Sequence, residues 1–374
     1  MLHTVDLQLR HRKRSCALRR HFTAVPGHEA ERGSQALGET HPASLPGAPV
    51  PPAQAWAGRL RAWLIRVGTV ALAALPLVGA AQPTPGPPDP TLPWMTTQVQ
   101  APRVTYRTFD SATVGAKVSY HAYIPAAHER STERLPVLYW LHATEGGVAA
   151  VRPLSRLFDE AIEAGRVPPM IVVFVNGLPR RLWADSKDGA SPVETVFIRE
   201  VIPHVDQSFR TIAAREGRIV EGFSMGGYGA ARLGFKYPGL FAGVSILAGG
   251  PFDLDLRGPR AQRNPRLREQ LLREVCGNDL EYFRAISPWM LASTAAASLR
   301  EYRTVVRHAV GTLDDTRELN RQFRERMAEL GIAHSYVELP GIGHEPRALL
   351  EALGEANARF YRQALGLAAP EPRP

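Results

Sequence analysis

The feature that most constrains the fold is a regular alternation of strand-like and helix-like segments, which begins at residue 103. The runs at 136–141 and 170–175 are apolar throughout, as expected for strands that helices cover on both faces. The runs at 104–109 and 116–124 alternate in polarity, which is typical of half-exposed antiparallel strands. Further strands are expected at 218–223, 244–248, 304–310 and 335–339. This order predicts an α/β protein with a mostly parallel central sheet and helices on both faces.

Helical periodicity fills the intervals between these strands. The segment 225–236 follows a predicted strand directly, and a further helix should begin at Ser191, whose side chain can cap it. Along that helix Glu194, Glu200 and Asp206 recur every six residues and are expected on a solvated face. Other helices are expected at 154–163, 265–274, 316–330 and 347–364.

The first hundred residues lack this pattern. The basic stretch R-L-R-A-W-L-I-R at 59–66 precedes an uncharged, mostly apolar run at 67–81 that ends in small residues. This order is typical of a secretory signal peptide, and the run is shorter than the roughly 20 residues that span a membrane. The stretch Q-P-T-P-G-P-P-D-P-T-L-P follows and predicts a polyproline-like spacer.

We therefore divide the chain into five parts. Residues 1–58 are either disordered or the result of a start placed too far upstream, and 59–81 are a signal peptide or an uncleaved membrane anchor. Residues 82–101 are a Pro-rich linker, 102–368 form the folded domain and 369–374 are a tail. This division predicts a secreted or periplasmic protein, which contacts a membrane only if the anchor is retained.

Charge and cysteine content exclude several classes of function. The chain has a net charge of +9, but residues 1–66 carry six of these charges, so the domain is only mildly basic. No nucleic-acid partner is expected. The two cysteines, Cys16 and Cys276, are too few for a disulfide framework or a Cys-based zinc site. The chain also lacks a P-loop and a dinucleotide fingerprint, so neither a cofactor nor a metal is expected.

The most informative motif is G-F-S-M-G-G at 222–227, where a predicted strand runs into a predicted helix. In that setting Ser224 would occupy a sharp, strained turn that projects its hydroxyl outward. Gly222, Gly226 and Gly227 remove the Cβ atoms that would crowd the crossing of strand and helix. The helix N-terminus also directs N–H groups and positive dipole at this point. Ser224 is therefore the predicted nucleophile.

A serine nucleophile needs a general base, which follows it in the chain in this type of fold. Three histidines follow Ser224 within the domain. His308 lies inside an apolar strand and is expected to be buried, and His334 opens a strand and is expected at the surface. His344 lies in the loop L-P-G-I-G-H-E-P, whose glycines allow the backbone to aim the ring. His344 is therefore the predicted base.

The base needs a carboxylate to orient it. Asp314 and Asp315 compete for this task in G-T-L-D-D-T-R-E, which follows the strand at 304–310. Asp315 resembles a helix cap, because Glu318 follows three residues later. This leaves Asp314 free for the base, so Asp314 is preferred and Asp315 is the alternative.

Oxyanion donors are expected on two loops. The backbone N–H of Met225, directly after the nucleophile, is one. The loop L-H-A-T-E-G-G after the strand at 136–141 should supply the other, and Thr144 is the candidate, whereas His142 is expected to be structural. Trp183 and Asp185, in R-L-W-A-D-S-K-D-G, are candidates for lining the substrate cleft.

These motifs resemble the α/β-hydrolase family described as "Putative esterase". The most characteristic stretch is R-E-G-R-I-V-E-G-F-S-M-G-G-Y-G-A-A-R-L-G-F-K-Y-P at 215–238, and V-I-P-H-V-D-Q-S-F-R-T, L-P-V-L-Y-W-L-H, G-T-L-D and P-G-I-G-H agree with it. The resemblance covers residues 104–365. One departure is His142-Ala143, where the family usually has His-Gly; the added Cβ narrows the loop that carries Thr144.

The resemblance implies an α/β-hydrolase fold with Ser224, His344 and Asp314 as a triad and Met225 and Thr144 as oxyanion donors. The family includes feruloyl and acetylxylan esterases, enterochelin-esterase-like enzymes, S-formylglutathione hydrolase and the antigen 85 mycolyltransferases. It therefore implies a serine carboxylesterase acting on a small-molecule or polysaccharide-linked ester. The alternatives are an acyltransferase using the same acyl-enzyme and a non-catalytic binding protein. Because the base must be neutral, activity should fall below about pH 6–7.

Overall fold

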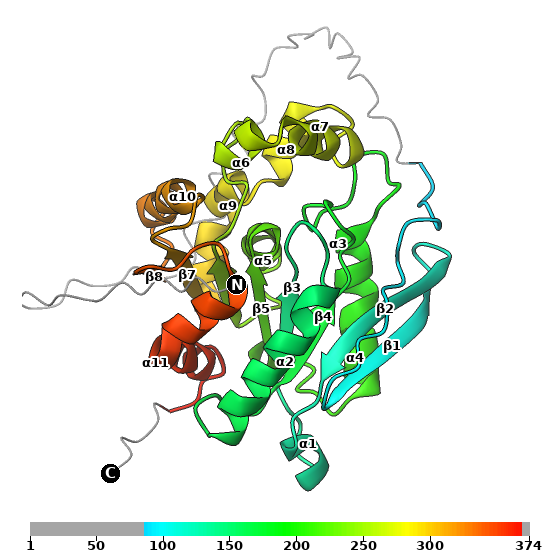
Figure 1. Cartoon of the computed structure of the whole chain (residues 1–374), viewed down its shortest axis with the longest axis vertical. Coiled ribbons are helices and arrows are strands. Elements are labelled where there is room, and N and C mark those ends of the chain that lie inside the picture. Colours follow the sequence, from blue (N-terminus) through cyan, green and yellow to red (C-terminus); the bar gives the residue numbers. More distant parts are fainter. Residues whose placement is uncertain (1–85, 369–374) are drawn as a thin grey trace, which may run out of the picture. The chain divides into compact units, whose positions relative to one another are not determined.

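The centre of the structure is an eight-stranded sheet with the order β1-β2-β4-β3-β5-β6-β7-β8 (Figure 1). The structure is a computed structural model that describes residues 86–368. β2 runs antiparallel to both of its neighbours, and all other neighbouring strands are parallel. The predicted sheet is confirmed, and every predicted strand lies within two residues of an observed one. The strands are β1 Val104–Ser111, β2 Ala116–Tyr123, β3 Val137–Leu141, β4 Ile171–Val175, β5 Arg218–Phe223, β6 Gly243–Leu247, β7 Val305–Gly311 and β8 His334–Leu339.

Helices cover both faces of this sheet, which explains the continuous apolar strands. In β3, Val137, Tyr139 and Leu141 pack into the core under α3, α4, α5, α9 and α10. Leu138 and Trp140 point the other way, into the core under α2 and α11. The helices on the two faces are α2 Val148–Glu163, α3 Val193–Val196, α4 Ile202–Ser208, α5 Met225–Lys236, α9 Pro288–Glu301, α10 Arg317–Glu329 and α11 Pro346–Ala364.

The helix expected from Ser191 begins at Val193 and contains a π-helical turn, Phe197–Val201, between α3 and α4. Pro203 follows that turn in the first residues of α4. Proline lacks an N–H and clashes with the preceding turn of a regular helix, so a widened turn lets the helix continue past it.

The expectation of a solvated acidic face on this helix is wrong. Glu194 is 3% exposed and forms an ion pair with Arg232 of α5. Glu200 accepts hydrogen bonds from hydroxyl groups of the turn between β1 and β2. Asp206 pairs with Arg218 of β5 at 2.6 Å. The spacing of six correctly placed these acids on one helix, but each of them is bound by a side chain of a neighbouring element.

The expected linker is also wrong from residue 86 onward, because that segment packs on the domain. Trp94 is 1% exposed. The side chain of Asn176 donates to the carbonyl of Trp94 at 2.9 Å, and the N–H of Ser119 donates to the same carbonyl at 3.0 Å. Further toward the N-terminus, the N–H of Gly86 donates to the carbonyl of Asp188. The proline-rich segment from residue 86 is therefore a strap that the domain binds through several backbone hydrogen bonds.

The expectations for 1–58, 59–81 and 369–374 concern residues outside the described range. Within 86–368, none of the helices combines the length and apolar character needed to cross a bilayer.

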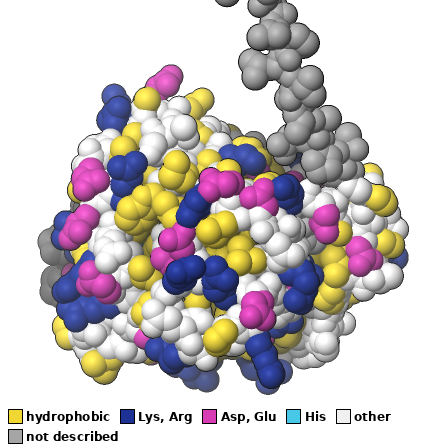
Figure 2. Space-filling view, turned by 90° about the horizontal axis from the view of Figure 1, so that it is seen from above, with side chains coloured by type: hydrophobic (Ala, Val, Ile, Leu, Met, Phe, Trp, Pro, Cys, Tyr) yellow, Lys and Arg dark blue, Asp and Glu magenta, His cyan; other side chains and the backbone are white. Residues whose placement is uncertain are grey.

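A group of short helices lies between β6 and α9. They are α6 Pro259–Arg263, α7 Pro265–Glu274 and α8 Leu280–Ile286. Of these, only α7 was predicted from the sequence. One more short helix, α1 Ala127–Arg130, lies between β2 and β3. These three helices gather at one end of the molecule (Figure 1). Figure 2 looks down on that end, where basic and acidic side chains interleave around apolar ones.

Candidate active site

Ser224 occupies the turn between β5 and α5. Its backbone has φ 59° and ψ −119°, a conformation that costs a residue with a side chain roughly 1–3 kcal/mol. The turn is held by hydrogen bonds on both sides: the Ser224 N–H donates to Leu247 of β6 at 2.9 Å, and its carbonyl accepts from Tyr228 and Gly250. The strained turn that the motif predicted is therefore present.

Glycines permit this turn because the backbones around it nearly touch. A Cβ on Gly222 would lie 2.1 Å from the carbonyl oxygen of Gly226, and one on Gly226 would lie 1.9 Å from that of Leu141. A Cβ on Gly227 would lie 2.8 Å from the carbonyl oxygen of Leu247. The obstructing atoms are backbone, which cannot rotate away, so the predicted role of all three glycines is physically required.

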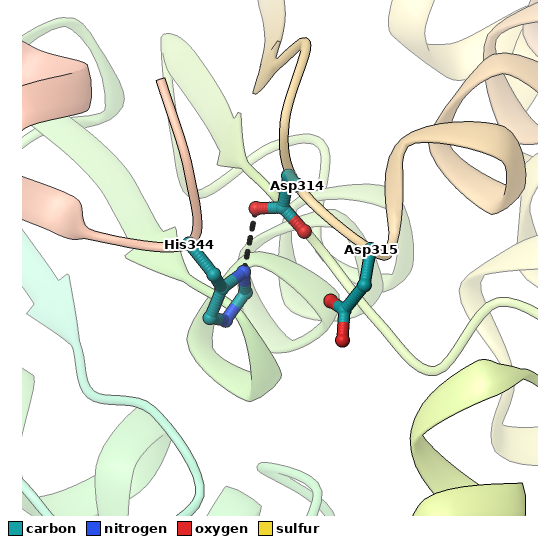
Figure 3. A group of neighbouring side chains, drawn as sticks. All are labelled: Asp314, Asp315 and His344. Carbon is teal, nitrogen blue, oxygen red and sulfur yellow. Dashed lines mark hydrogen bonds and ion pairs between the residues drawn. The ribbon is translucent and has the colours of Figure 1, made fainter. Parts of the chain in front are cut away.

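His344 and Asp314 meet across two loops at the ends of β8 and β7 (Figure 3). His344 Nδ1 lies 2.6 Å from Asp314 Oδ2. An ionised carboxylate only accepts, so Nδ1 carries the proton and Nε2 keeps its lone pair. Nε2 is buried and has no hydrogen-bond partner among the described residues. The ring packs on Phe223, the residue before Ser224, with ring centroids 4.3 Å apart.

Asp314 is held by a second residue that the sequence analysis did not identify. Its Oδ1 accepts from the Thr316 N–H at 2.8 Å and from the Thr316 hydroxyl at 2.7 Å. Burial disfavours the charged carboxylate, but the bonds from His344 and Thr316 outweigh it and lower the pKa of Asp314. Asp-x-Thr is a recognisable turn pattern, so the signal for Thr316 was present in the sequence.

Asp315 does not cap α10, contrary to expectation. The residue before the helix is Thr316, and no side-chain bond caps its N-terminus. Asp315 instead forms ion pairs with Arg260 and Arg263 of α6. In Figure 3 the Asp314 carboxylate reaches the imidazole, whereas the carboxylate of Asp315 makes no bond to it. The choice between the two acids that the sequence left open is thus made by the direction of their side chains.

The two candidate oxyanion donors open on the same cavity as Ser224. Thr144 and Met225 both line it. Neither of their backbone N–H groups donates to any acceptor in the described part of the chain, while the Thr144 carbonyl is fixed by the N–H of Arg180 at 2.9 Å. Free N–H groups beside a nucleophile are what a developing oxyanion requires.

His142 is structural, as expected. Its Nε2 accepts from the N–H of Gly177 at 3.1 Å, so its Nδ1 is protonated and donates to the carbonyl of Ala143. Burial lowers the pKa of His142 to about 4. Both ring nitrogens are occupied, and this histidine cannot act as a second base.

The expectation that Trp183 and Asp185 line the substrate cleft is wrong. Trp183 is fully buried, and its indole N–H donates to the carbonyl of His142 at 3.2 Å. Asp185 accepts two hydrogen bonds from Thr195, at the start of the α3–α4 helix. An indole wedged beside the His142 carbonyl supports the loop that carries Thr144, so Trp183 acts behind the site rather than in it.

The cavity next to Ser224 has a volume of about 80 Å³ and walls that are mostly apolar. Ser224, Met225 and Thr144 line it together with residues of α6, α7 and the segment before them. Its apolar lining residues are Leu182, Met225, Pro251, Leu256, Pro259, Ala261, Leu267, Leu271 and Leu319.

Not every expected contact is made. No hydrogen bond joins the Ser224 hydroxyl to His344 Nε2 in this structure, and free enzymes commonly show such loose geometry. Asp314, Asp315 and His344 offer possible ligand atoms within 4.8 Å of one another. However, the Nδ1 and Oδ2 atoms bind each other and Asp315 is paired with arginines, so this group does not fit a cation.

Comparison with known proteins agrees with this geometry. The family described as "Putative esterase" matches residues 111–347. The chain belongs to this esterase family. A curated relative, "Esterase Rv1288" of Mycobacterium tuberculosis, is 29% identical over an alignment of 296 residues, and the match covers 72% of this chain. The match covers 62% of that relative, so the chain spans less than two thirds of its length.

Solved structures of esterases share the fold of this family member. A ferulic acid esterase is 21% identical with a TM-score of 0.56, and the match covers 69% of this chain and 98% of that chain. An S-formylglutathione hydrolase from Agrobacterium tumefaciens is 17% identical with a TM-score of 0.56, and covers 72% and 99%. These similarities establish the α/β-hydrolase fold that the sequence predicted.

Proposed function

We propose that the protein is a serine carboxylesterase that forms an acyl-enzyme on Ser224. The observation that carries this proposal is the state of the imidazole. His344 is fixed at Nδ1 by Asp314, and its basic Nε2 is buried, unbonded and packed beside the strained serine turn. A buried nitrogen without a partner costs free energy, and removing the serine proton is a use that accounts for it.

In the first half-reaction the Ser224 Oγ attacks the ester carbonyl carbon while His344 Nε2 takes its proton. The carbonyl oxygen becomes negatively charged and accepts from the N–H groups of Met225 and Thr144. Asp314 stays ionised, as its lowered pKa favours, and stabilises the imidazolium. When the tetrahedral intermediate collapses, the carbon–oxygen bond to the alcohol breaks and Nε2 returns the proton to the departing alcohol.

The second half-reaction repeats these steps with water as the nucleophile. His344 Nε2 removes a proton from water, whose oxygen attacks the acyl carbon, and the same amides hold the oxyanion. Collapse breaks the ester bond to Ser224 and returns the proton to its Oγ. The products are one carboxylic acid and one alcohol, and the enzyme is regenerated.

The substrate is proposed to be a small-molecule ester or an ester carried by a polysaccharide. Support comes from a relative in Xylanibacter ruminicola named "Endo-1,4-beta-xylanase/feruloyl esterase", 29% identical over 164 residues, and from the ferulic acid esterase structure. The first of these matches covers 41% of this chain and 23% of the relative. An acyltransferase would share the first half-reaction, so only the fate of the acyl-enzyme separates the two.

The test is a panel of esters assayed on the full chain and on Ser224→Ala. We expect the wild-type protein to hydrolyse one or more of acetyl, longer acyl and feruloyl esters, and the variant to lose turnover by several orders of magnitude. A fluorophosphonate should label the wild type alone. Undiminished hydrolysis in the variant would refute the assignment, and product appearing mainly on an added sugar or lipid alcohol would replace hydrolysis by acyl transfer.

Export is part of the proposal and rests on the sequence at 59–81 alone. We expect the native protein from culture medium or periplasm to begin after residue 81. N-terminal sequencing of the native protein measures this directly, and a start within 1–58 would contradict it.

A further inference from the structure

We infer that Asp315 anchors α6 as a wall of the acyl pocket and thereby sets which acyl groups the site accepts. This inference rests on the proposed function, because it assigns the cavity beside Ser224 to the acyl group. Asp315 is then a positioning residue, which acts on the substrate through α6 and does not touch the reacting atoms.

α6 lines the same cavity as Ser224. Gly258, Pro259, Arg260 and Ala261 all contribute to its walls. An acyl group bound to the Ser224 oxygen would occupy this space. The position of α6 therefore limits the length and width of the acyl group.

α6 has little structure of its own to hold it in place. It is five residues long, Pro259–Arg263, and no side chain caps its N-terminus. Hydrogen bonds to Asp253 from the N–H groups of Arg257 and Gly258 stay within the same segment. A helix this short is marginal in water, so contacts with other elements must fix its place.

Asp315 supplies those contacts with both of its oxygens. Arg260 donates to Oδ1 through Nε at 3.0 Å and through Nη2 at 2.9 Å, and Arg263 pairs with Oδ2. Within residues 86–368, Asp315 is the sole residue outside the 250–268 segment to which α6 side chains are joined by a hydrogen bond or ion pair. The remaining support is apolar, where the backbone at Gly258 packs against Leu319 of α10.

The chemistry of the pocket indicates a largely apolar acyl group. Two charged residues of its lining already have partners, because Arg260 pairs with Asp315 and Asp253 accepts hydrogen bonds from two backbone N–H groups. Arg268 also lines the cavity and donates to the carbonyl of Asp255. The rest of the lining is mostly leucine and proline side chains, which an alkyl or aryl group would contact.

The test compares Asp315→Ala with the wild type on p-nitrophenyl esters from acetyl to dodecanoyl. Loss of the anchor should let α6 move outward, so the ratio of kcat/KM for octanoyl to acetyl should rise about fivefold, which is about 1 kcal/mol. The double variant Arg260→Met/Arg263→Met removes the same pairs from the other side and should give the same ratio. A general loss of stability would lower all the rates in parallel and leave the ratio unchanged.

Glu318→Gln is the matched control, because this exposed carboxylate lies in the first turn of α10, close to Asp315, and pairs with Arg321 at 3.9 Å. Its ratio of kcat/KM for octanoyl to acetyl esters should equal that of the wild type. Amide hydrogen exchange of residues 257–264 provides a readout that does not need catalysis, and it should accelerate in Asp315→Ala and not in the control. Unchanged exchange or an unchanged ratio would overturn the anchor, whereas absence of hydrolysis in the wild type with accelerated exchange would overturn the proposed function alone.

Discussion

A buried ion pair between β5 and β7 allows a quantitative prediction. Glu221 of β5 and Arg307 of β7 pair while 0% and 1% exposed. Arg307 also donates to Ser245 at 3.0 Å and to Asn357 at 2.5 Å, and the Tyr361 hydroxyl donates to Glu221 at 2.9 Å. The arginine is thus fully satisfied, and the carboxylate depends on it for charge compensation.

Replacing the arginine alone should be far more costly than replacing both partners. Arg307→Met leaves the Glu221 carboxylate buried with one neutral donor, and breaking buried pairs in this way costs about 3–5 kcal/mol. For a domain of this size that loss lowers Tm by roughly 10 °C. The double variant Glu221→Gln/Arg307→Met has no stranded charge, so we expect it to regain more than half of the lost stability.

Urea or thermal unfolding of the three proteins at pH 7 measures this. The single variant should be the least stable of the three. Arg307→Met that unfolds like the wild type, or a double variant as unstable as the single one, would refute the argument that charge compensation dominates at this position.

Two further predictions concern single hydrogen-bonding groups. Thr316→Val removes the hydroxyl that donates to Asp314, keeps the backbone N–H that also donates to it, and leaves the side-chain volume nearly constant. We expect kcat/KM for the best ester of the panel to fall about tenfold and Tm to change little. An unaltered rate would show that the bond from the backbone N–H is sufficient. Hydrogen bonds to the Glu338 carboxylate, chiefly from Arg321 and also from Arg317, lower the pKa of Glu338 to about 2. A depressed carboxyl pKa stabilises the fold above the unfolded value near 4.5 and loses that effect as pH falls toward 2. Glu338→Gln should therefore cost about 1 kcal/mol at pH 7, reduced by the partial exposure of the arginines, and nothing near pH 2; a deficit independent of pH in chemical denaturation would contradict the linkage.

The sequence predicted the elements whose local pattern and tertiary environment agree. The strands β3 and β4 are buried on both faces, so their apolar runs had a single interpretation. The helix at 225–236 matches α5 at both ends, because glycines fix its start and Pro238 follows its end. The same chemistry singled out Ser224 and His344, since few residues satisfy the order of nucleophile and base.

Only the tertiary structure decided where the charged side chains go. Glu194 and Asp315 appear in the sequence as a surface acid and a helix cap, yet each pairs with arginines from a distant segment. The spacing of residues within one element cannot reveal a partner on another. The same limit applies to Trp183, whose burial depends on the close approach of Gly177 and Gly229.

The amino-acid pattern thus determined the sheet, the strained turn at Ser224 and the identity of the candidate base, because these depend on local backbone geometry and on which residue types can do the chemistry. The packing of distant segments determined which of two adjacent aspartates faces the imidazole and which one holds α6. Two neighbouring residues share nearly the same backbone position, so only the surrounding side chains can give them different partners.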